Sequence, residues 1–549
     1  MKNSWLGILA LISLGINLII AQFQTMPGYM DADYYYANAQ RIFQGNGWTE
    51  KFLWNYLDMP EGIPHPAFLY WMPLASMIGA IGLRLTGMET YSSARIGFLA
   101  IAAFVPPLTA WLALQITQKK NAALIAGIMA LFPGFYLPYL AITETFGIYM
   151  VLGGSFFLLA GQFHNLLCSA TDTRYNSFSL LLSALVWGLI SGLMHLARVD
   201  GISWFMIGLG SLLFVYFSRS QTDESESFRS GFQRKLEAGF LVLLFVAGYA
   251  LIMHQWFLRN LALYGNLFPE GSLRALWLVD YDDLFMFPPS SLTPKRWLES
   301  GIGNLFEARL WSFTQNFKTT IAVQGMILLL PLSLWGAWKK KKYLQTRLGV
   351  ICWLAAWILM TVIYPYQGGR GGYFHSVAAL QPLFWAWASA GFDSFINWGI
   401  ERRGWIYRRS WRAFSAAIIG MIIAMTCYVV WQNIYQSDLQ KPGGDSIYKL
   451  YEEIDQELRK TGESQGAIVM VNNPPGYTAI TGRPAIMIPD GDLKTVLAAG
   501  DYYSAKYLVL DKNYPKGLKD IYANPGHFPG LMYLSTYDDV RIFKFKDVK

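Results

Sequence analysis

Apolar runs about as long as a membrane crossing recur along this sequence, and the charged residues lie mainly in segments between them. The first run, Leu6 to Ala21, approaches the ~20 residues that a helix needs to cross the hydrocarbon core of a bilayer. Of the 549 residues, 54% are hydrophobic and only 15% are charged, which is too apolar for one soluble domain. The pattern therefore predicts an α-helical protein that crosses the membrane many times.

The distribution of basic residues explains the formal net charge of +8. These residues gather in short loops between apolar runs, as in Lys119-Lys120, Lys339–Lys342 and Arg402-Arg403. Such clustering is typical of the cytoplasmic loops of membrane proteins, and it explains the charge better than binding to nucleic acid does. The three cysteines form neither a disulfide framework nor a zinc-type cluster.

One semi-apolar stretch, Ala67 to Leu83, decides the predicted topology. If it were a full span, Lys119-Lys120 would lie outside and the sides of all later loops would reverse. If it is an interfacial helix, the basic loops fall together on the inner side. We therefore predict an interfacial helix and about eleven transmembrane helices, with the N-terminus inside and the C-terminus outside. The predicted spans are 5–22, 93–116, 121–139, 147–167, 178–196, 201–217, 237–257, 319–338, 348–364, 377–397 and 413–435.

The composition changes near residue 436, which predicts two domains. Residues 1–435 form the transmembrane domain, with a first outer loop at 23–92, and residues 436–549 form a small soluble extracytoplasmic α/β domain. We interpret Gln221–Arg234 and Lys441–Gly444 as linkers and Asn473–Gly476 as a turn. The elements predicted after residue 436 are helices at Ile447–Arg459 and Asp492–Ala499 and strands at Ala467–Val471, Tyr507–Leu510, Leu531–Leu534 and Val540–Phe545.

Two carboxylates stand just beyond the first apolar run, in Asp31-Ala32-Asp33. A helix-compatible stretch, Tyr34 to Phe43, follows them, with enough aromatic and apolar residues to lie along the interface. Two interpretations remain open. The carboxylates act on a substrate at headgroup depth, or they place negative charge at the N-terminus of this helix.

Further polar and ionisable residues collect on the predicted outer side. Such groups at a membrane boundary usually line a cavity, and several arginines beside a few carboxylates suit an anionic lipid-linked substrate. For any single arginine, an extended side chain that reaches the headgroups is the simpler explanation. The residues are Lys51 and His65 in the first outer loop, Glu144 in the second, His195, Arg198 and Asp200 in the third, Arg259 and Asn260 in the fourth, and Arg370, Tyr373 and His375 in a glycine-rich segment.

Several of these strings resemble motifs of the GT-C superfamily of glycosyltransferases. Asp31 to Ala37 with Gly45-Asn46-Gly47 is similar to the acidic first-loop signature, and His65-Pro66 leads into an apolar stretch as in that group. Trp256 to Asn260 with Tyr264-Gly265-Asn266 resembles a segment of bacterial members related to protein O-mannosyltransferases and aminoarabinose transferases. Ala197 to Gly201 is also similar to that group. The resemblance covers most of residues 1–400.

The resemblance implies roles for particular residues. Asp31 and Asp33 would be the catalytic carboxylates, Glu144 would assist them, and Arg198, Arg259 and Arg370 would hold the lipid phosphate. The first-loop pair is usually Asp-Glu but is Asp-Ala-Asp here, so which carboxylate is primary stays open. The second-loop acid is often Asp and is Glu144 here. The other outer residues are candidates for substrate binding.

We therefore predict an inverting glycosyltransferase of the inner membrane that works on its outer face. It would move a sugar from a polyprenyl-phosphate donor to the hydroxyl of a lipid, glycan or protein acceptor, with a carboxylate as general base. A divalent cation such as Mg²⁺ or Mn²⁺ is compatible with Asp31, Asp33 and Glu144, but a monophosphate donor does not require one. The alternatives are a lipid or sugar transporter (a flippase) and a non-catalytic scaffold. The absence of internal sequence repeats and the position of the acids at outer helix ends favour the enzyme.

Overall fold

The computed structural model describes residues 4–169, 174–219, 230–436, 444, 446–526 and 528–546. The chain divides into two compact units, each assembled from separate stretches of the sequence. We call the first the helical unit; it comprises Met1–Ile20, Phe98–Gly265 and Trp311–Tyr435. We call the second the sheet unit; it comprises Ala21–Gly97, Asn266–Leu310 and Gln436–Lys549.

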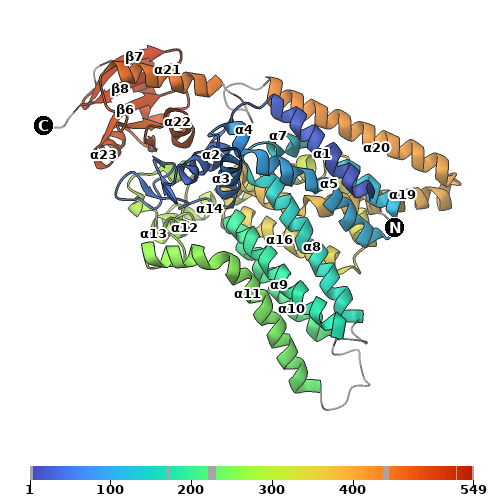
Figure 1. Ribbon diagram of the computed structural model, residues 1–549. Coiled ribbons are helices and arrows are strands. Elements are labelled where there is room, and N and C mark those ends of the chain that lie inside the picture. Colours follow the sequence, from blue (N-terminus) through green and yellow to red (C-terminus); the bar gives the residue numbers. More distant parts are fainter. Residues whose placement is uncertain are drawn as a thin grey trace. The chain divides into compact units, whose positions relative to one another are not determined.

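The helical unit is a bundle in which α9 packs against α8, α10 and α11 (Figure 1), while α19 packs against α6 and α15. The helices with all or part of their length in this unit are α1 (Ser4–Gln22), α5 (Ile96–Thr117), α6 (Lys120–Leu131), α7 (Leu137–Leu140), α8 (Thr145–Ser169), α9 (Arg174–Ala197), α10 (Ile202–Arg219), α11 (Ser230–Tyr264), α14 (Gly301–Thr319), α15 (Leu330–Lys339), α16 (Leu344–Ile358), α17 (Pro365–Gln367), α18 (Tyr373–Ser376), α19 (Gln381–Arg403) and α20 (Tyr407–Val430).

The predicted class, an α-helical polytopic membrane protein with a small C-terminal sheet region, is confirmed. Among the described residues, eight helices are long and apolar enough to cross a membrane, and a ninth is added if α6 and the bent segment Gly134–Leu140 form one span. Two of the eleven predicted spans are not in this set. Residues 319–338 are interrupted by a π-helical turn at Thr320–Gln324, and residues 377–397 fall on α19, which carries Asp393 and Asn397. The number of spans and their sidedness stay predictions.

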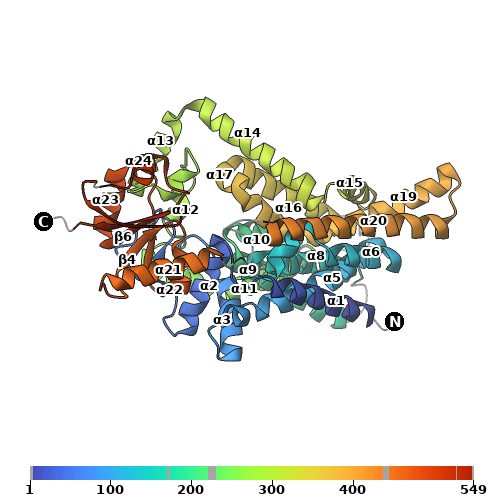
Figure 2. The same ribbon diagram turned by 90° about the horizontal axis from the view of Figure 1, so that it is seen from above.

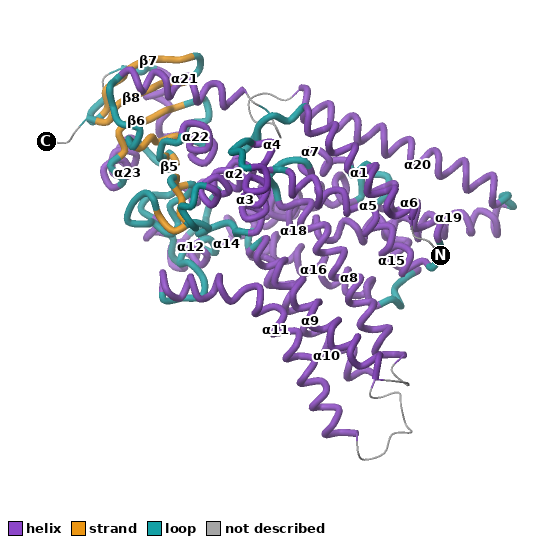
Figure 3. The backbone as a smooth tube through the Cα atoms, viewed as in Figure 1, coloured by secondary structure: helices purple, strands orange, loops and turns teal. Residues whose placement is uncertain are grey.

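A β-sheet is the centre of the sheet unit (Figures 2 and 3). It has six strands in the order β2-β5-β4-β6-β8-β7, and β1 pairs with β3 in a separate two-stranded sheet. Strands β2, β5, β4 and β6 are parallel to one another, and β8 is antiparallel to both of its neighbours, β6 and β7. Helices α21 and α22 cover one face, where residues such as Ile454 pack against Val469 and Val509. The strands are β1 (Thr49–Glu50), β2 (Phe52–Leu53), β3 (His65–Pro66), β4 (Ile468–Val471), β5 (Ala485–Met487), β6 (Ala505–Leu510), β7 (Leu531–Tyr537) and β8 (Val540–Phe545). The helices are α2 (Met30–Phe43), α3 (Leu74–Thr86), α4 (Tyr91–Ala94), α12 (Gly271–Arg274), α13 (Pro294–Glu299), α21 (Ser446–Lys460), α22 (Pro474–Thr481), α23 (Leu493–Tyr502) and α24 (Lys519–Ala523).

Strand β2 comes from the first loop, yet it is an edge strand of the C-terminal sheet. Phe52 and Leu53 pair in parallel with Ala485 and Ile486, and the N–H of Ala485 donates to the carbonyl of Lys51 at 3.1 Å. The C-terminal sheet is therefore completed by a strand that lies more than 400 residues earlier in the sequence. The predicted boundary at residue 436 stays a prediction.

The predicted elements after residue 436 are confirmed in α21, α23, β4, β6, β7 and β8. The predicted turn at Asn473–Gly476 is wrong, because Asn473 caps α22 and two prolines open that helix. Proline is favoured in the first helical turn, where its missing N–H is not needed. The predicted linkers lie outside the described residues at 221–229 and 441–443. At residues 230–234 the linker prediction is wrong, because these residues begin α11.

The first loop contains two helices that bear on the topology. Helix α2 begins at Met30, four residues earlier than predicted, so both Asp31 and Asp33 lie in its first turn. Helix α3 has 13 residues, a length of ~20 Å at 1.5 Å per residue, which is too short to cross a bilayer. This length supports the interfacial interpretation of the stretch.

Candidate functional site

Asp33 is fully enclosed in the sheet unit. Its side chain is 0% exposed, and it accepts hydrogen bonds from Tyr448 Oη at 2.5 Å and Asn473 Nδ2 at 2.7 Å. Burial raises the pKa of Asp33 from 3.8 to about 7, opposed by these two hydrogen bonds and assisted by the charge of Asp31. Both partners belong to the C-terminal part of the sheet unit, Gln436–Lys549, which we call the C-terminal segment. Asp33 therefore links α2 to the C-terminal segment.

Asp31, by contrast, is only half-buried. Residues two apart on an α-helix are separated by about 200° around its axis, so Asp31 projects away from the side on which Asp33 is held. The interval between the carboxylates, Asp31-Ala32-Asp33, thus gives them different surroundings. The structure favours Asp31 as the carboxylate that meets a substrate.

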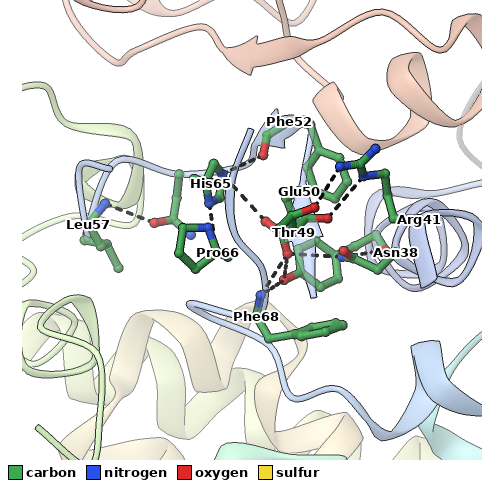
Figure 4. A network of polar contacts seen from close by, with 11 residues as sticks. Asn38, Arg41, Thr49, Glu50, Phe52, Leu57, His65, Pro66 and Phe68 are labelled. Atoms are coloured by element: carbon green, nitrogen blue, oxygen red, sulfur yellow. Dashed lines mark hydrogen bonds and ion pairs between the residues drawn. The ribbon is translucent and has the colours of Figure 1, made fainter. Parts of the chain in front are cut away.

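A polar network encloses Glu50 beside α2 (Figure 4). Tyr34 Oη donates to Glu50 Oε1, which also accepts from Asn38 Nδ2 at 3.1 Å and from the N–H of Phe68 at 2.9 Å. Burial raises the pKa of Glu50, and the nearby His65 opposes this shift. The network holds the face of α2 that carries Tyr34 and Asn38.

His65 belongs to this network. Its Nδ1 and Nε2 each lie 2.9 Å from a backbone carbonyl, of Pro66 and Phe52 respectively, and its Nε2 lies 3.8 Å from Glu50 Oε2. The ring is buried at 4% exposure. These contacts favour a structural role for His65. Lys51, also proposed from the sequence, lies between β1 and β2 and is half-buried.

The helical unit brings together Glu144, just before α8, and His375 of α18. Glu144 Oε2 accepts from the backbone N–H of Thr145 and from its Oγ1 at 3.0 Å, and it lies 3.6 Å from His375 Nδ1. The ring of Phe146 stacks on His375 with a centroid distance of 4.1 Å. Burial, and then the charge of Arg198, lower the pKa of His375 well below its usual value. The imidazole is therefore neutral at neutral pH.

Arg198 and Asp200, which follow α9, extend this cluster. Arg198 Nε donates to Asp200 Oδ1 at 2.8 Å, and the guanidinium lies 5.7 Å from the ring centre of Tyr149. Both side chains are mostly buried, at 13% and 9% exposure. Four residues proposed from the sequence, Glu144, Arg198, Asp200 and His375, therefore form one polar cluster, which we call the helical-unit cluster.

The other proposed residues have different surroundings. His195 is buried, and its Nδ1 lies 2.6 Å from Tyr249 Oη. Arg259 stacks on Trp256 at 5.0 Å and donates to Asn260 Oδ1 at 3.2 Å. Both contacts come from one turn of α11, so the Trp-x-x-Arg-Asn string is a local structural unit.

The glycine-rich segment around Arg370 is a π-helical turn, Gly368–Gly372. A Cβ on Gly369 would lie 2.4 Å from the ring of Trp311, so this glycine permits close packing within the protein. Arg370 is exposed. Tyr373 is buried and bonds Thr320 Oγ1 at 3.0 Å, which favours a structural role for its hydroxyl.

Glu144 and His375 fit a divalent cation. They offer a carboxylate oxygen and a neutral imidazole nitrogen 3.6 Å apart, a separation that one ion with nitrogen and oxygen ligands can bridge. His375 was not among the metal ligands proposed from the sequence.

Several residues of these networks were not predicted as site residues. Among them are Glu50, Tyr149, Tyr448 and Asn473. For Glu50, a glutamate in the same loop as a histidine is a weak sequence signal. Tyr448 and Asn473 have no sequence signal, because their partner Asp33 lies more than 400 residues away.

No protein-family model matches the chain, and no curated protein matches it in sequence. Solved structures are similar to it in fold. One is the oligosaccharyltransferase AglB from Archaeoglobus fulgidus in complex with an inhibitory peptide and a dolichol-phosphate, at TM-score 0.53 and 16% identity, covering 92% of this chain and 69% of that one.

A second structure of the Archaeoglobus fulgidus oligosaccharyltransferase, in complex with Zn and sulfate, also matches at TM-score 0.53 and 16% identity, covering 96% of this chain and 72% of that one. ArnT from Cupriavidus metallidurans, bound to undecaprenyl phosphate, matches at TM-score 0.51 and 10% identity over 100% of this chain and 99% of that one. The chain is a multi-pass α-helical membrane protein whose fold is similar to the folds of these solved structures.

Proposed function

We propose that the protein transfers a sugar from a polyprenyl-phosphate donor to an acceptor hydroxyl on the outer face of the inner membrane. The observation that carries the proposal is the helical-unit cluster, in which an arginine, two carboxylates and a neutral histidine gather in a GT-C fold. Two solved structures with this fold contain dolichol-phosphate and undecaprenyl phosphate. These ligands support a lipid phosphate as the leaving group.

In the proposed reaction, Asp31 is the general base. The acceptor oxygen attacks the anomeric carbon and its proton passes to the Asp31 carboxylate. The bond from that carbon to the phosphate oxygen breaks, and its electron pair stays on the polyprenyl phosphate. Attack from the side opposite the leaving group inverts the configuration at this carbon.

Cationic side chains stabilise the charge that grows on the leaving phosphate. We assign this role to Arg259 and Arg370, two of the three arginines that the sequence resemblance implies at the lipid phosphate, with Arg198 as the next candidate. Glu144 and His375 would hold a divalent cation, which supplies additional positive charge when bound. One solved structure with this fold was determined with Zn.

The test is sugar transfer by the purified protein, with a radiolabelled polyprenyl-phosphate sugar as donor and, in separate reactions, lipids, glycans and proteins of the membrane as acceptors. We expect label in the acceptor fraction and an equal amount of free polyprenyl phosphate, both lost in Asp31→Asn. If the donor stays intact with lipid, glycan and protein acceptors alike, the proposed function is wrong.

A further inference from the structure

Two side chains of the C-terminal segment form hydrogen bonds with the start of α2. Tyr448 Oη of α21 donates to Asp33 at 2.5 Å and accepts from the backbone N–H of Gly28 at 2.7 Å. One hydroxyl therefore binds both the chain before α2 and the first turn of the helix. Tyr448 is itself buried, at 2% exposure, so this contact is shielded from water.

Asn473 is the second of these side chains, and both ends of its amide are used. The Oδ1 atom accepts from the N–H of Gly476 at 3.2 Å and caps α22, while Nδ2 donates to Asp33 Oδ2 at 2.7 Å. A Cβ on Gly476 would lie 2.7 Å from that same carboxylate oxygen. Helix α22 thus approaches Asp33 so closely that only glycine fits at this point.

Further contacts hold α2. Tyr34 and Asn38 bond Glu50. Gln40 lies seven residues after Asp33 and therefore on the same face of the helix, and its Nε2 donates to the carbonyl of Ala479 in α22 at 3.3 Å. These contacts fix the rotation of α2 about its axis. The direction of Asp31, one turn of backbone before Tyr34, is set by that rotation.

We infer that Tyr448 and Asn473 are positioning residues for Asp31, and that the C-terminal segment serves the reaction by fixing the rotation of α2. The inference rests on the proposed function in assigning Asp31 as the base. It gives the C-terminal segment a role in the reaction. It also explains why Asp33, which is buried, lies two residues from Asp31, the proposed general base.

Tyr448→Phe tests the inference, and Tyr507→Phe is its matched control. Both tyrosines belong to the same hydrophobic cluster. Tyr448→Phe loses the hydrogen bonds to Asp33 and from Gly28, and Tyr507→Phe also loses a hydroxyl that forms a hydrogen bond. Tyr507 Oη bonds Thr461 Oγ1 at 2.6 Å and has no role in holding α2. A general loss of stability would affect the two variants alike.

The first measurement is hydrogen–deuterium exchange of the amides of α2, which requires no activity. We expect at least about fivefold faster exchange in the first turn of α2 in Tyr448→Phe, because the hydrogen bonds of its hydroxyl to Asp33 and Gly28 are lost, and unchanged exchange there in Tyr507→Phe. Unchanged exchange in Tyr448→Phe would overturn the inference, whether or not the protein transfers sugar.

The second measurement is steady-state transfer. We expect kcat to fall about tenfold in Tyr448→Phe while the KM for donor stays within twofold, because the base is displaced and donor binding is not. Tyr507→Phe should keep both constants within twofold. Equal kcat values in the two variants would overturn the inference. Failure of the wild-type protein to transfer sugar would instead contradict the proposed function, and the exchange data would still decide whether Tyr448 holds α2.

Discussion

Glu144 Oε2 lies 3.6 Å from His375 Nδ1 in the helical unit. The carboxylate precedes α8, and the imidazole belongs to α18. Hydrogen bonds from Thr145 orient the carboxylate, and the stacked ring of Phe146 orients the imidazole. Because burial keeps the histidine neutral, its imidazole can bind a cation without first losing a proton.

We therefore expect the purified protein to bind a divalent cation. The variants Glu144→Gln and His375→Ala should bind it more weakly than the wild-type protein. Removal of a ligand that contacts the ion should weaken binding by more than the about 10- to 100-fold that is typical when a residue that only orients a ligand is lost. Metal content after dialysis and the rise in melting temperature on adding metal measure this directly. His254→Ala, at an exposed histidine, is the control. Equal metal content in all variants would show that Glu144 and His375 do not hold a cation, and the mechanism would then not include one.

The two first-turn carboxylates should respond differently to amidation. Asp31→Asn removes the proposed base, so kcat should fall by a factor of about 10² to 10⁴ with little change in melting temperature. Asp33→Asn places an amide N–H against the donors Tyr448 and Asn473, so it should lower stability by about 1 to 3 kcal/mol. Thermal unfolding in detergent and transfer rates separate the two effects. A normal transfer rate in Asp31→Asn would mean that Asp31 only places negative charge at the N-terminus of α2.

The pH dependence of stability should report Asp33. Its pKa is raised from 3.8 to about 7, so between these values the folded state holds a proton that the unfolded state releases. This contribution to stability is complete below pH 4 and is lost as the pH rises toward 7. We expect the melting temperature to fall over this interval, with a smaller fall in Asp33→Asn. Equal slopes in the two proteins would show that Asp33 does not titrate in this range.

The arginines proposed for the phosphate should affect donor binding. Replacing Arg259 or Arg370 with alanine should raise the KM for donor more than the KM for acceptor, because a guanidinium offers paired donors to a phosphate. Lysine should recover only part of the effect. Arg403→Ala is a matched control, because Arg403 also stacks on a tryptophan, at 5.9 Å from Trp398, and lies on the predicted inner side. Altered acceptor kinetics alone would point to Arg198 as the phosphate ligand.

Local patterns predicted the parts of the fold that depend on local sequence. The amphipathic helix α21 and strand β8 were predicted within one or two residues of their ends, because each carries its own periodicity. Strands β2 and β5, of two and three residues, were missed because they exist only through pairing with each other and with β4. Periodicity cannot detect a strand of that length.

The same limit applies to the site. The sequence identified Glu144 and His375 as polar residues on the predicted outer side, but their contact depends on tertiary packing. Asp31 and Asp33 were equivalent in the sequence, and only the partners Tyr448 and Asn473 distinguish them. Local sequence shows which residue types are present; burial and distant partners decide which of them can react.

The most direct test of the central claim places the purified protein in sealed vesicles with a radiolabelled polyprenyl-phosphate sugar and an acceptor lipid. The account predicts that label accumulates on the acceptor in step with free polyprenyl phosphate, and that Asp31→Asn abolishes both. Movement of intact donor between the two leaflets, with no free polyprenyl phosphate, would contradict the account and identify a transporter.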